Sequence, residues 1–230
     1  AGFDLVAQGM SGLMSINGHP DAPPAKIPVP MADLNAGLFA AYGIVAAYVN
    51  RLRTGKGQYL ETSLLEAALA YTVYESSVHF ATGEIPRPTG SQHRLIAPYQ
   101  AFRTSDGYIN IGAANQGNWE RMCRAIGRED LLDDPRFADN AARLTAVAYL
   151  QPELDCTFAG RSTEGWLRVL EEAGVPAGPI YDMEQAWSDE QVQAREMDVT
   201  LDHPTAGPVR NIGLAVKMYG TPGEIRSPAP

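Results

Sequence analysis

The sequence predicts an α+β protein in which helices dominate and the strands are short. A long run of apolar residues at helical spacing follows residue 33, and a β-hairpin pattern lies at residues 99–111. Isolated strand-like segments occur near residues 175–180 and 209–216. Because helices and strands do not alternate as a βαβ repeat does, a regular parallel sheet is not expected within these residues.

The strongest pattern predicts a long helix that begins after Asp33. Apolar side chains recur there at intervals of three and four residues, which is typical of a buried helical face; they are Leu38, Tyr42, Val45, Val49 and Leu52. Asp33 is expected at the N-cap, and Gly55 and Gly57 are expected to end the helix. Residues 58–63 then predict a short strand, and residues 64–81 a second helix that ends near Gly83.

The residues on either side of this region predict different kinds of structure. Residues 1–30 are rich in Gly, Pro and Ala and end in a proline-dense run, so a loop is expected. Residues 99–103 and 108–111 predict a hairpin that turns at residues 105–107. The helices expected after it are residues 118–126, 141–158 and 163–173.

Composition excludes several classes of partner. Hydrophobic residues make up 45% and charged residues 20% of the chain, as in ordinary globular proteins. The net charge of -9 argues against a surface for nucleic acid or an anionic membrane, which would need an excess of Lys and Arg. No run of about 18 apolar residues and no signal-peptide pattern is evident, so no membrane partner is expected.

Cysteine usage indicates a cytoplasmic protein without a metal. The only cysteines are Cys123 and Cys156, and neither lies in a C-x-x-C motif or a Cys/His cluster with metal-ligand spacing. Two free thiols in a reducing cytoplasm are therefore expected. His79 and His93 have no Cys, Ser or second His at catalytic spacing, so both are expected to be structural.

Several short motifs follow one another in a specific order. Four of them are Phe3–Gln8 with Ser11-Gly12, Ala32–Gly37, Arg53–Gln58, and Tyr99–Phe102 with Asp106-Gly107-Tyr108. Others follow at Asp133–Phe137, Gly174–Pro179 and His203-Pro204. Taken together, these motifs resemble class III coenzyme A transferases of the CaiB/BaiF type, which include formyl-CoA transferase, and the resemblance covers nearly the whole chain.

The resemblance implies a fold that is α/β overall. Proteins of this family combine a Rossmann-like large domain with a smaller α+β domain, and two subunits interlock as a homodimer. By this resemblance, residues 1–92 and 189–230 belong to the large domain and residues 93–188 form the small one. Family members are longer than this chain, so we expect a fragment that lacks the N-terminal third and a C-terminal tail.

The resemblance also implies a reaction. The family moves CoA between carboxylic acids through an aspartate, which corresponds to Asp33 in this chain. That carboxylate would form a mixed anhydride with the acyl group and then an aspartyl-CoA thioester. Acyl-CoA and a carboxylic acid are the implied partners, with CoA as a substrate and no metal. At a helix N-terminus, backbone N–H groups should favour the carboxylate form.

Further site residues follow from the same resemblance. Asp4 matches a second carboxylate beside the catalytic aspartate and is expected to be catalytic. Phe3 and Gln8 match positions near the active site, where Phe3 occupies an aromatic position often held by Tyr. Gly90 and Gln92 match the region of a mobile glycine-containing loop, although this chain lacks the consecutive glycines. These four residues are expected to bind substrate.

Two alternatives remain open at this level. An α-methylacyl-CoA racemase would share the fold and the Asp33 position, but it needs two acid/base groups on opposite faces of its substrate. Racemases of this family carry Gly-His-Asp where this chain has Gly2-Phe3-Asp4. The chain could also be a non-catalytic fragment that folds. The donor and acceptor acids are not identified by the sequence.

Overall fold

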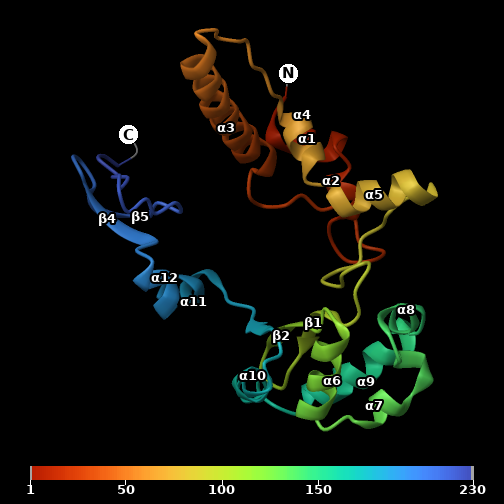
Figure 1. Ribbon diagram of the computed structural model, residues 1–230. Coiled ribbons are helices and arrows are strands. Elements are labelled where there is room, and N and C mark those ends of the chain that lie inside the picture. Colours follow the sequence, from red (N-terminus) through yellow and green to blue (C-terminus); the bar gives the residue numbers. More distant parts are fainter. Residues whose placement is uncertain (1, 229–230) are drawn as a thin grey trace.

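The computed structural model describes residues 2–228 and shows three parts along the chain (Figure 1). The first part contains α1 (Asp4–Met10), α2 (Leu13–Ile16), α3 (Met31–Thr54), α4 (Leu64–Ala70) and α5 (Val73–Thr82). The second contains β1 (Tyr99–Arg103), β2 (Tyr108–Gly112), α6 (Gln116–Ala125), α7 (Asp130–Asp133), the 3-10 helix η1 (Pro135–Phe137), α8 (Asn140–Thr145), α9 (Val147–Ala159), α10 (Thr163–Glu172) and β3 (Ala177–Pro179). The third contains α11 (Met183–Ser188), α12 (Glu190–Ala194), β4 (Asp198–His203) and β5 (Gly207–Ile212).

The start of the chain differs from the sequence prediction in two ways. Residues 1–30 were expected to form a loop, but α1 and α2 lie within them. The helix α3 begins at Met31 with Pro30 as its N-cap residue, so Asp33 is the third helical residue and not the N-cap. The N-cap prediction was wrong because a distant side chain, Asp4, accepts the N–H group of Ala32 and replaces a local cap.

Residues 58–81 also depart from the prediction. Residues 58–63 do not form a strand, because none of the strands within residues 2–228 pairs with them to complete the backbone hydrogen bonds. The expected helix over residues 64–81 is broken between α4 and α5. At the break the Thr72 hydroxyl donates to the Leu69 carbonyl at 2.8 Å, so a side chain competes with the helical backbone pattern.

The middle part is built on a three-stranded antiparallel sheet in the order β1-β2-β3. The predicted hairpin is confirmed: β1 pairs with β2, and Arg103 lies opposite Tyr108 across the expected turn. The helix expected over residues 141–158 is two helices, α8 and α9, that meet at Ala146. Apolar side chains from the sheet and helices form the larger buried cluster of the protein, which includes Phe102, Ile109, Trp119, Phe158 and Leu170.

A buried arginine joins several elements of this middle part. The Arg143 side chain donates to the carbonyl oxygens of Ala97 at 2.7 Å and Phe137 at 3.1 Å, and to Gln116 Oε1 at 3.0 Å. Its guanidinium also lies 4.8 Å from the centre of the Trp119 ring. Burial lowers the pKa of Arg143 from its usual value, and nearby Cys123 and Asp139 act in the opposite direction.

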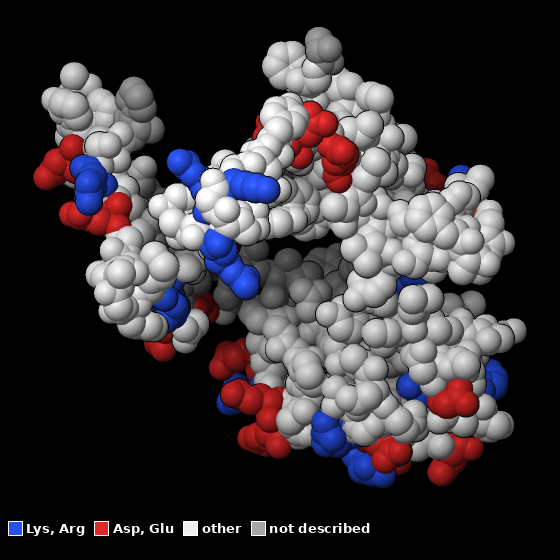
Figure 2. Space-filling model, turned by 45° about the horizontal axis from the view of Figure 1, so that its top comes forward, with Lys and Arg blue, Asp and Glu red and all other residues white. Residues whose placement is uncertain are grey.

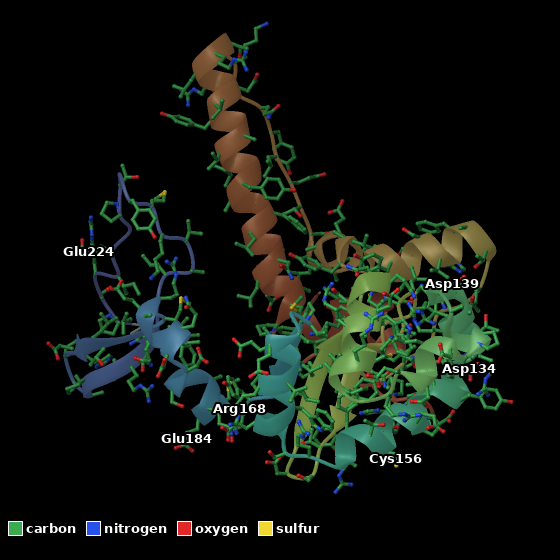
Figure 3. All side chains as sticks on the ribbon, turned by 60° about the horizontal axis from the view of Figure 1, so that its bottom comes forward. Asp134, Asp139, Cys156, Arg168, Glu184 and Glu224 are labelled. Atoms are coloured by element: carbon green, nitrogen blue, oxygen red, sulfur yellow. The ribbon has the colours of Figure 1, made fainter. Side chains whose placement is uncertain are left out.

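Replacement of this arginine should therefore destabilise the protein. Arg143→Met leaves the buried carbonyl oxygens of Ala97 and Phe137 without this donor, so we expect the free energy of unfolding to fall by about 2–4 kcal/mol. Urea unfolding followed by tryptophan fluorescence measures the change. Arg168→Met is the matched control, since Arg168 lies at the surface in Figure 3 and its side chain is 70% exposed. Equal unfolding midpoints for the two variants would contradict the role given to Arg143.

The C-terminal part contains a two-stranded sheet that the sequence revealed only partly. A strand was expected over residues 209–216, and β5 lies at Gly207–Ile212. Its antiparallel partner β4 was missed. Half-buried and exposed side chains alternate along both strands, but no side chain in either strand is fully buried, so the pattern is weaker than that of a strand with one buried face.

The three parts leave an unusually large surface. The accessible area is 15287 Å², whereas a compact monomer of this mass would expose about 10,000 Å². Part of this surface lies on α3, which stands clear of neighbouring ribbons on most sides in Figure 3. Its exposed apolar side chains are Leu34, Leu38, Tyr42, Ile44, Val45, Tyr48, Val49 and Leu52.

The helix α3 is long and apolar enough, by length and composition alone, to cross a membrane, although its sequence contains no uninterrupted apolar run of about 18 residues. Only 11% of its most apolar 18-residue window is buried in the structure. Core helices of soluble proteins meet the same criteria, so the expectation of no membrane partner stays a prediction.

The two buried clusters draw on separate stretches of the sequence. The larger one draws only on residues 102–175, and a small one contains Ala7, Leu13, Ala32 and Ala68. The domain boundaries after residues 92 and 188 stay a prediction.

Candidate active site

Asp33 lies at an exposed position next to a firmly held stretch of backbone. It belongs to the first turn of α3, and its side chain is exposed. The preceding residue, Ala32, is fully buried against Ala7, Leu13 and Ala68. Asp33 is therefore accessible to a reactant while its backbone is held by packing.

Asp4 lies beside this turn. Its Oδ1 accepts a hydrogen bond from the Ala32 N–H at 2.8 Å, and its Oδ2 accepts one from Gln8 Nε2 at 2.8 Å. Asp4 is thus hydrogen-bonded to the residue next to Asp33, and each of its oxygens already has a donor within the protein. A catalytic role for Asp4 in direct contact with substrate stays a prediction.

Gln8 is fully buried and links α1 to the segment that leads into α3. Its Nε2 donates to Asp4 and to the Ile27 carbonyl at 3.2 Å, and its Oε1 accepts from the Ile27 N–H at 2.9 Å. A longer contact of 3.4 Å reaches the Val29 carbonyl. The amide is engaged with the chain itself, and the predicted contact with substrate is untested.

Phe3 and the turn at residues 89–92 have no hydrogen bond to Asp4 or Gln8 among those found in the described residues. The Phe3 side chain is 79% exposed at the start of α1. The Gly90 N–H donates to the Gly18 carbonyl at 2.9 Å, which ties this turn to the loop between α2 and α3. Gln92 closes the turn, because its carbonyl accepts the Thr89 hydroxyl at 2.7 Å. Substrate binding by Phe3, Gly90 and Gln92 stays a prediction.

The backbone conformation and close packing at position 90 favour glycine. Its φ is +67°, and a Cβ atom there would lie 3.0 Å from His19 Nδ1. A side chain at this position would be strained by the backbone conformation and crowded by the imidazole.

The other potential nucleophiles are poorly suited to attack an acyl group. Burial raises the pKa of Cys123 to about 12, so its thiolate is not populated near neutral pH. Cys156 is exposed on the outer side of α9, well away from α3 (Figure 3). His93 Nδ1 accepts a hydrogen bond from the Leu95 N–H at 3.0 Å, which occupies that nitrogen.

Asp33 is exposed, and among the described residues it lines none of the better-formed pockets. One hollow of about 690 Å³ lies between β4 and the C-terminal segment and contains none of the predicted site residues. Charged side chains occur in small separate groups of both signs on the face seen in Figure 2, and most of that face is uncharged. Within residues 2–228, no group of three or more His, Cys, Asp or Glu is arranged to hold a metal ion.

Comparison with known proteins shows which family these features belong to. The family model described as CoA-transferase family III matches residues 1–230. The chain belongs to CoA-transferase family III. It is 32% identical over 230 residues to the succinate–glutarate CoA-transferase of Agrobacterium fabrum, covering all of this chain and 58% of that protein. It is 36% identical over 217 residues to the succinyl-CoA:glutarate CoA-transferase of Mus musculus, covering 94% of this chain and 50% of that protein.

A solved structure agrees with this membership. A CaiB/BaiF family protein from Brucella suis superposes with a TM-score of 0.81 and 33% identity, covering all of this chain and 60% of that one. The predicted class, α+β in this chain and of CoA-transferase III type, is therefore confirmed. The chain spans between half and three fifths of the length of these relatives.

Proposed function

We propose that the protein to which this chain belongs transfers CoA between carboxylic acids, with Asp33 as the group that is acylated. The observation that carries the proposal is the exposed carboxylate of Asp33 on an anchored first turn of α3, in a chain of CoA-transferase family III. Residues outside this chain would complete the site, because the relatives are considerably longer.

The proposed reaction has two symmetrical halves. The Asp33 carboxylate attacks the thioester carbonyl of the donor and releases the CoA thiolate, which leaves a mixed anhydride. The thiolate then attacks the Asp33 carbonyl, releases the donor acid and forms an aspartyl-CoA thioester. The acceptor carboxylate attacks that thioester to form a second anhydride, and the thiolate attacks its acyl carbonyl to give the new acyl-CoA and free Asp33.

A covalent route suits this exchange because it divides the transfer into successive acyl exchanges, each of which keeps an activated acyl group, so the energy of the thioester is not lost to hydrolysis. The anchored backbone around Ala32 supports accurate placement of the carboxylate against a bound thioester. Water must be excluded while the anhydride exists, since hydrolysis would end the cycle.

Short dicarboxylic acids are the first substrates to test. The names of the two relatives include succinate or succinyl-CoA and glutarate. Full-length protein should convert succinyl-CoA and glutarate to glutaryl-CoA, measured by chromatography of the CoA esters. Hydrolysis of succinyl-CoA at the same rate with and without an acceptor acid would contradict a transferase.

Racemase activity is not expected. Phe3 stands where the second base of a racemase would be needed, and a phenyl ring can neither give nor accept a proton. We expect no enzymatic incorporation of deuterium from solvent into a 2-methylacyl-CoA, measured by mass spectrometry. Exchange that depends on the protein and disappears in Asp33→Asn would overturn this expectation.

The assembly and cellular setting are part of the same proposal. The large exposed apolar face of α3 supports a homodimer in which other parts of the protein cover it. The two free cysteines are compatible with the cytoplasm. We propose no nucleic-acid or membrane partner.

A further inference from the structure

The N-terminus of α3 is not capped by the side chain of its own N-cap residue. The N-cap residue is Pro30, which has no side-chain acceptor, and no side-chain hydrogen bond comes from that position. The Ala32 N–H, in the first turn, instead donates to Asp4 Oδ1 at 2.8 Å. Asp4 lies 28 residues earlier in the chain and belongs to another helix. A carboxylate that accepts from a helix N-terminal N–H group stabilises that terminus.

Gln8 extends this connection to the segment before α3. It is one helical turn after Asp4 on α1, and it holds both Asp4 Oδ2 and the backbone of Ile27. The Ile27 N–H and carbonyl both bond to the same amide, as a neighbouring strand would bond to them. Because Gln8 is fully buried, these bonds are shielded from exchange with water.

We infer that Asp4 and Gln8 are positioning residues, which fix the first turn of α3 and thereby the placement of Asp33, and that Asp4 does not act by exchanging a proton with substrate. The kinetic part of this inference rests on the proposed function. The structural part does not, since it concerns only the hydrogen bonds between α1 and the start of α3.

Two substitutions at Asp4 separate positioning from acid/base chemistry. Asp4→Ala removes the acceptor for Ala32, and a displacement near 1 Å of a reacting group can cost about 100-fold in rate. Asp4→Asn keeps an oxygen acceptor for Ala32 but removes the charge and the ability to titrate, and its amide N–H group replaces the oxygen that accepts from Gln8. In the full-length protein we expect Asp4→Ala to lower kcat about 100-fold with KM changed less than threefold. Asp4→Asn should retain kcat within about tenfold.

A third variant tests Gln8 by itself. Gln8→Glu keeps the size of the side chain and the acceptor for the Ile27 N–H. It removes the donor to Asp4 and to the Ile27 carbonyl, and it places a second carboxylate beside Asp4. We expect a fall in kcat similar to that of Asp4→Ala.

Hydrogen–deuterium exchange provides a readout that does not depend on activity. The peptide covering residues 27–35 should exchange at least tenfold faster in Asp4→Ala and Gln8→Glu than in the wild type, and by a smaller factor in Asp4→Asn, which keeps the acceptor for Ala32 but loses the one for Gln8. Asp139→Ala is the matched control, because Asp139 accepts the Ala142 N–H at 2.8 Å as the N-cap of α8 in another part of the chain. It should leave residues 27–35 and kcat unchanged.

The outcomes divide clearly. Loss of activity in Asp4→Asn as severe as in Asp4→Ala, with residues 27–35 exchanging as slowly as in the wild type, would show that the charge or proton of Asp4 is needed and would overturn the inference. Unchanged exchange of residues 27–35 in Asp4→Ala would also overturn it. A wild-type protein without transferase activity would refute the proposed function, while the exchange data would still decide whether Asp4 and Gln8 hold α3.

Discussion

The 230-residue chain, expressed alone, should self-associate and should not transfer CoA. Its accessible area exceeds that of a compact monomer by about half. Apolar side chains on α3 such as Leu38, Val45 and Leu52 are more than 60% exposed. Exposed apolar patches larger than a few hundred Å² are rare on monomers and usually mark a contact surface. Sedimentation velocity at micromolar concentration should therefore show a dimer or larger species.

A pair of variants tests whether α3 is responsible for association. Val45→Glu places a charge in the middle of the exposed face and should shift the chain toward monomer. Ile180→Glu is the matched control, because Ile180 is also a half-exposed aliphatic residue but lies outside α3. A wild-type chain that sediments as a monomer, or an equal response to the two substitutions, would contradict the account of this surface.

The absence of transfer has a separate reason. The chain spans 58% of one relative and 50% of another, and Asp33 is exposed among the described residues. Loss of a single oxyanion donor costs about 100- to 1000-fold in rate, and loss of substrate positioning adds to that. A purified chain of 230 residues that turns over at about 1 per second, a common enzyme rate, would show that it contains a complete site.

Asp33→Asn should abolish transfer by the full-length protein. An amide cannot attack the thioester to give an anhydride, so we expect kcat to fall by a factor on the order of 10⁴ or more, as is typical when a covalent nucleophile is removed. Stability should change little, because the side chain is exposed. Steady-state assays with succinyl-CoA and glutarate measure the effect.

Asp21→Asn is the matched control for this substitution. Asp21 is an exposed carboxylate in the loop before α3, and its φ of 60° is one that Asn tolerates. Its activity should equal that of the wild type. Retention of more than a few per cent of activity by Asp33→Asn would mean that another group forms the covalent bond.

Secondary structure was predicted most accurately where a single periodic pattern of apolar residues extends over a whole helix or strand. The spacing of Leu38, Tyr42 and Val45 predicted α3, and the paired strand patterns predicted the β1–β2 hairpin. The same spacing was wrong about burial, since it predicted a buried face and those residues are exposed within this chain. A pattern of apolar residues shows that a surface will be covered but not which part of a protein covers it.

The errors near the site have a common physical cause. The cap of α3 comes from Asp4, and the Gln8 amide bonds to Ile27, 19 residues away. Local patterns cannot reveal contacts between residues so far apart, so the N-cap was assigned to Asp33 and α1 was missed.

Asp33 itself was identified by family resemblance and not by its local pattern, since an Asp near the start of a helix is most often a simple cap. The structure adds that its side chain is exposed and that the adjacent backbone is held by Asp4 and by packing of Ala32. These features support the assignment without testing it.

Trapping the covalent intermediate tests the central claim most directly. Full-length protein mixed with succinyl-CoA and then treated with borohydride should reduce an aspartyl-CoA thioester to an alcohol, which converts that aspartate side chain to homoserine. Peptide mass spectrometry should find the modification on Asp33, only when succinyl-CoA is present, and never in Asp33→Asn. A modification at Asp4 or any other carboxylate, or none at all in a protein that is actively transferring CoA, would contradict the account.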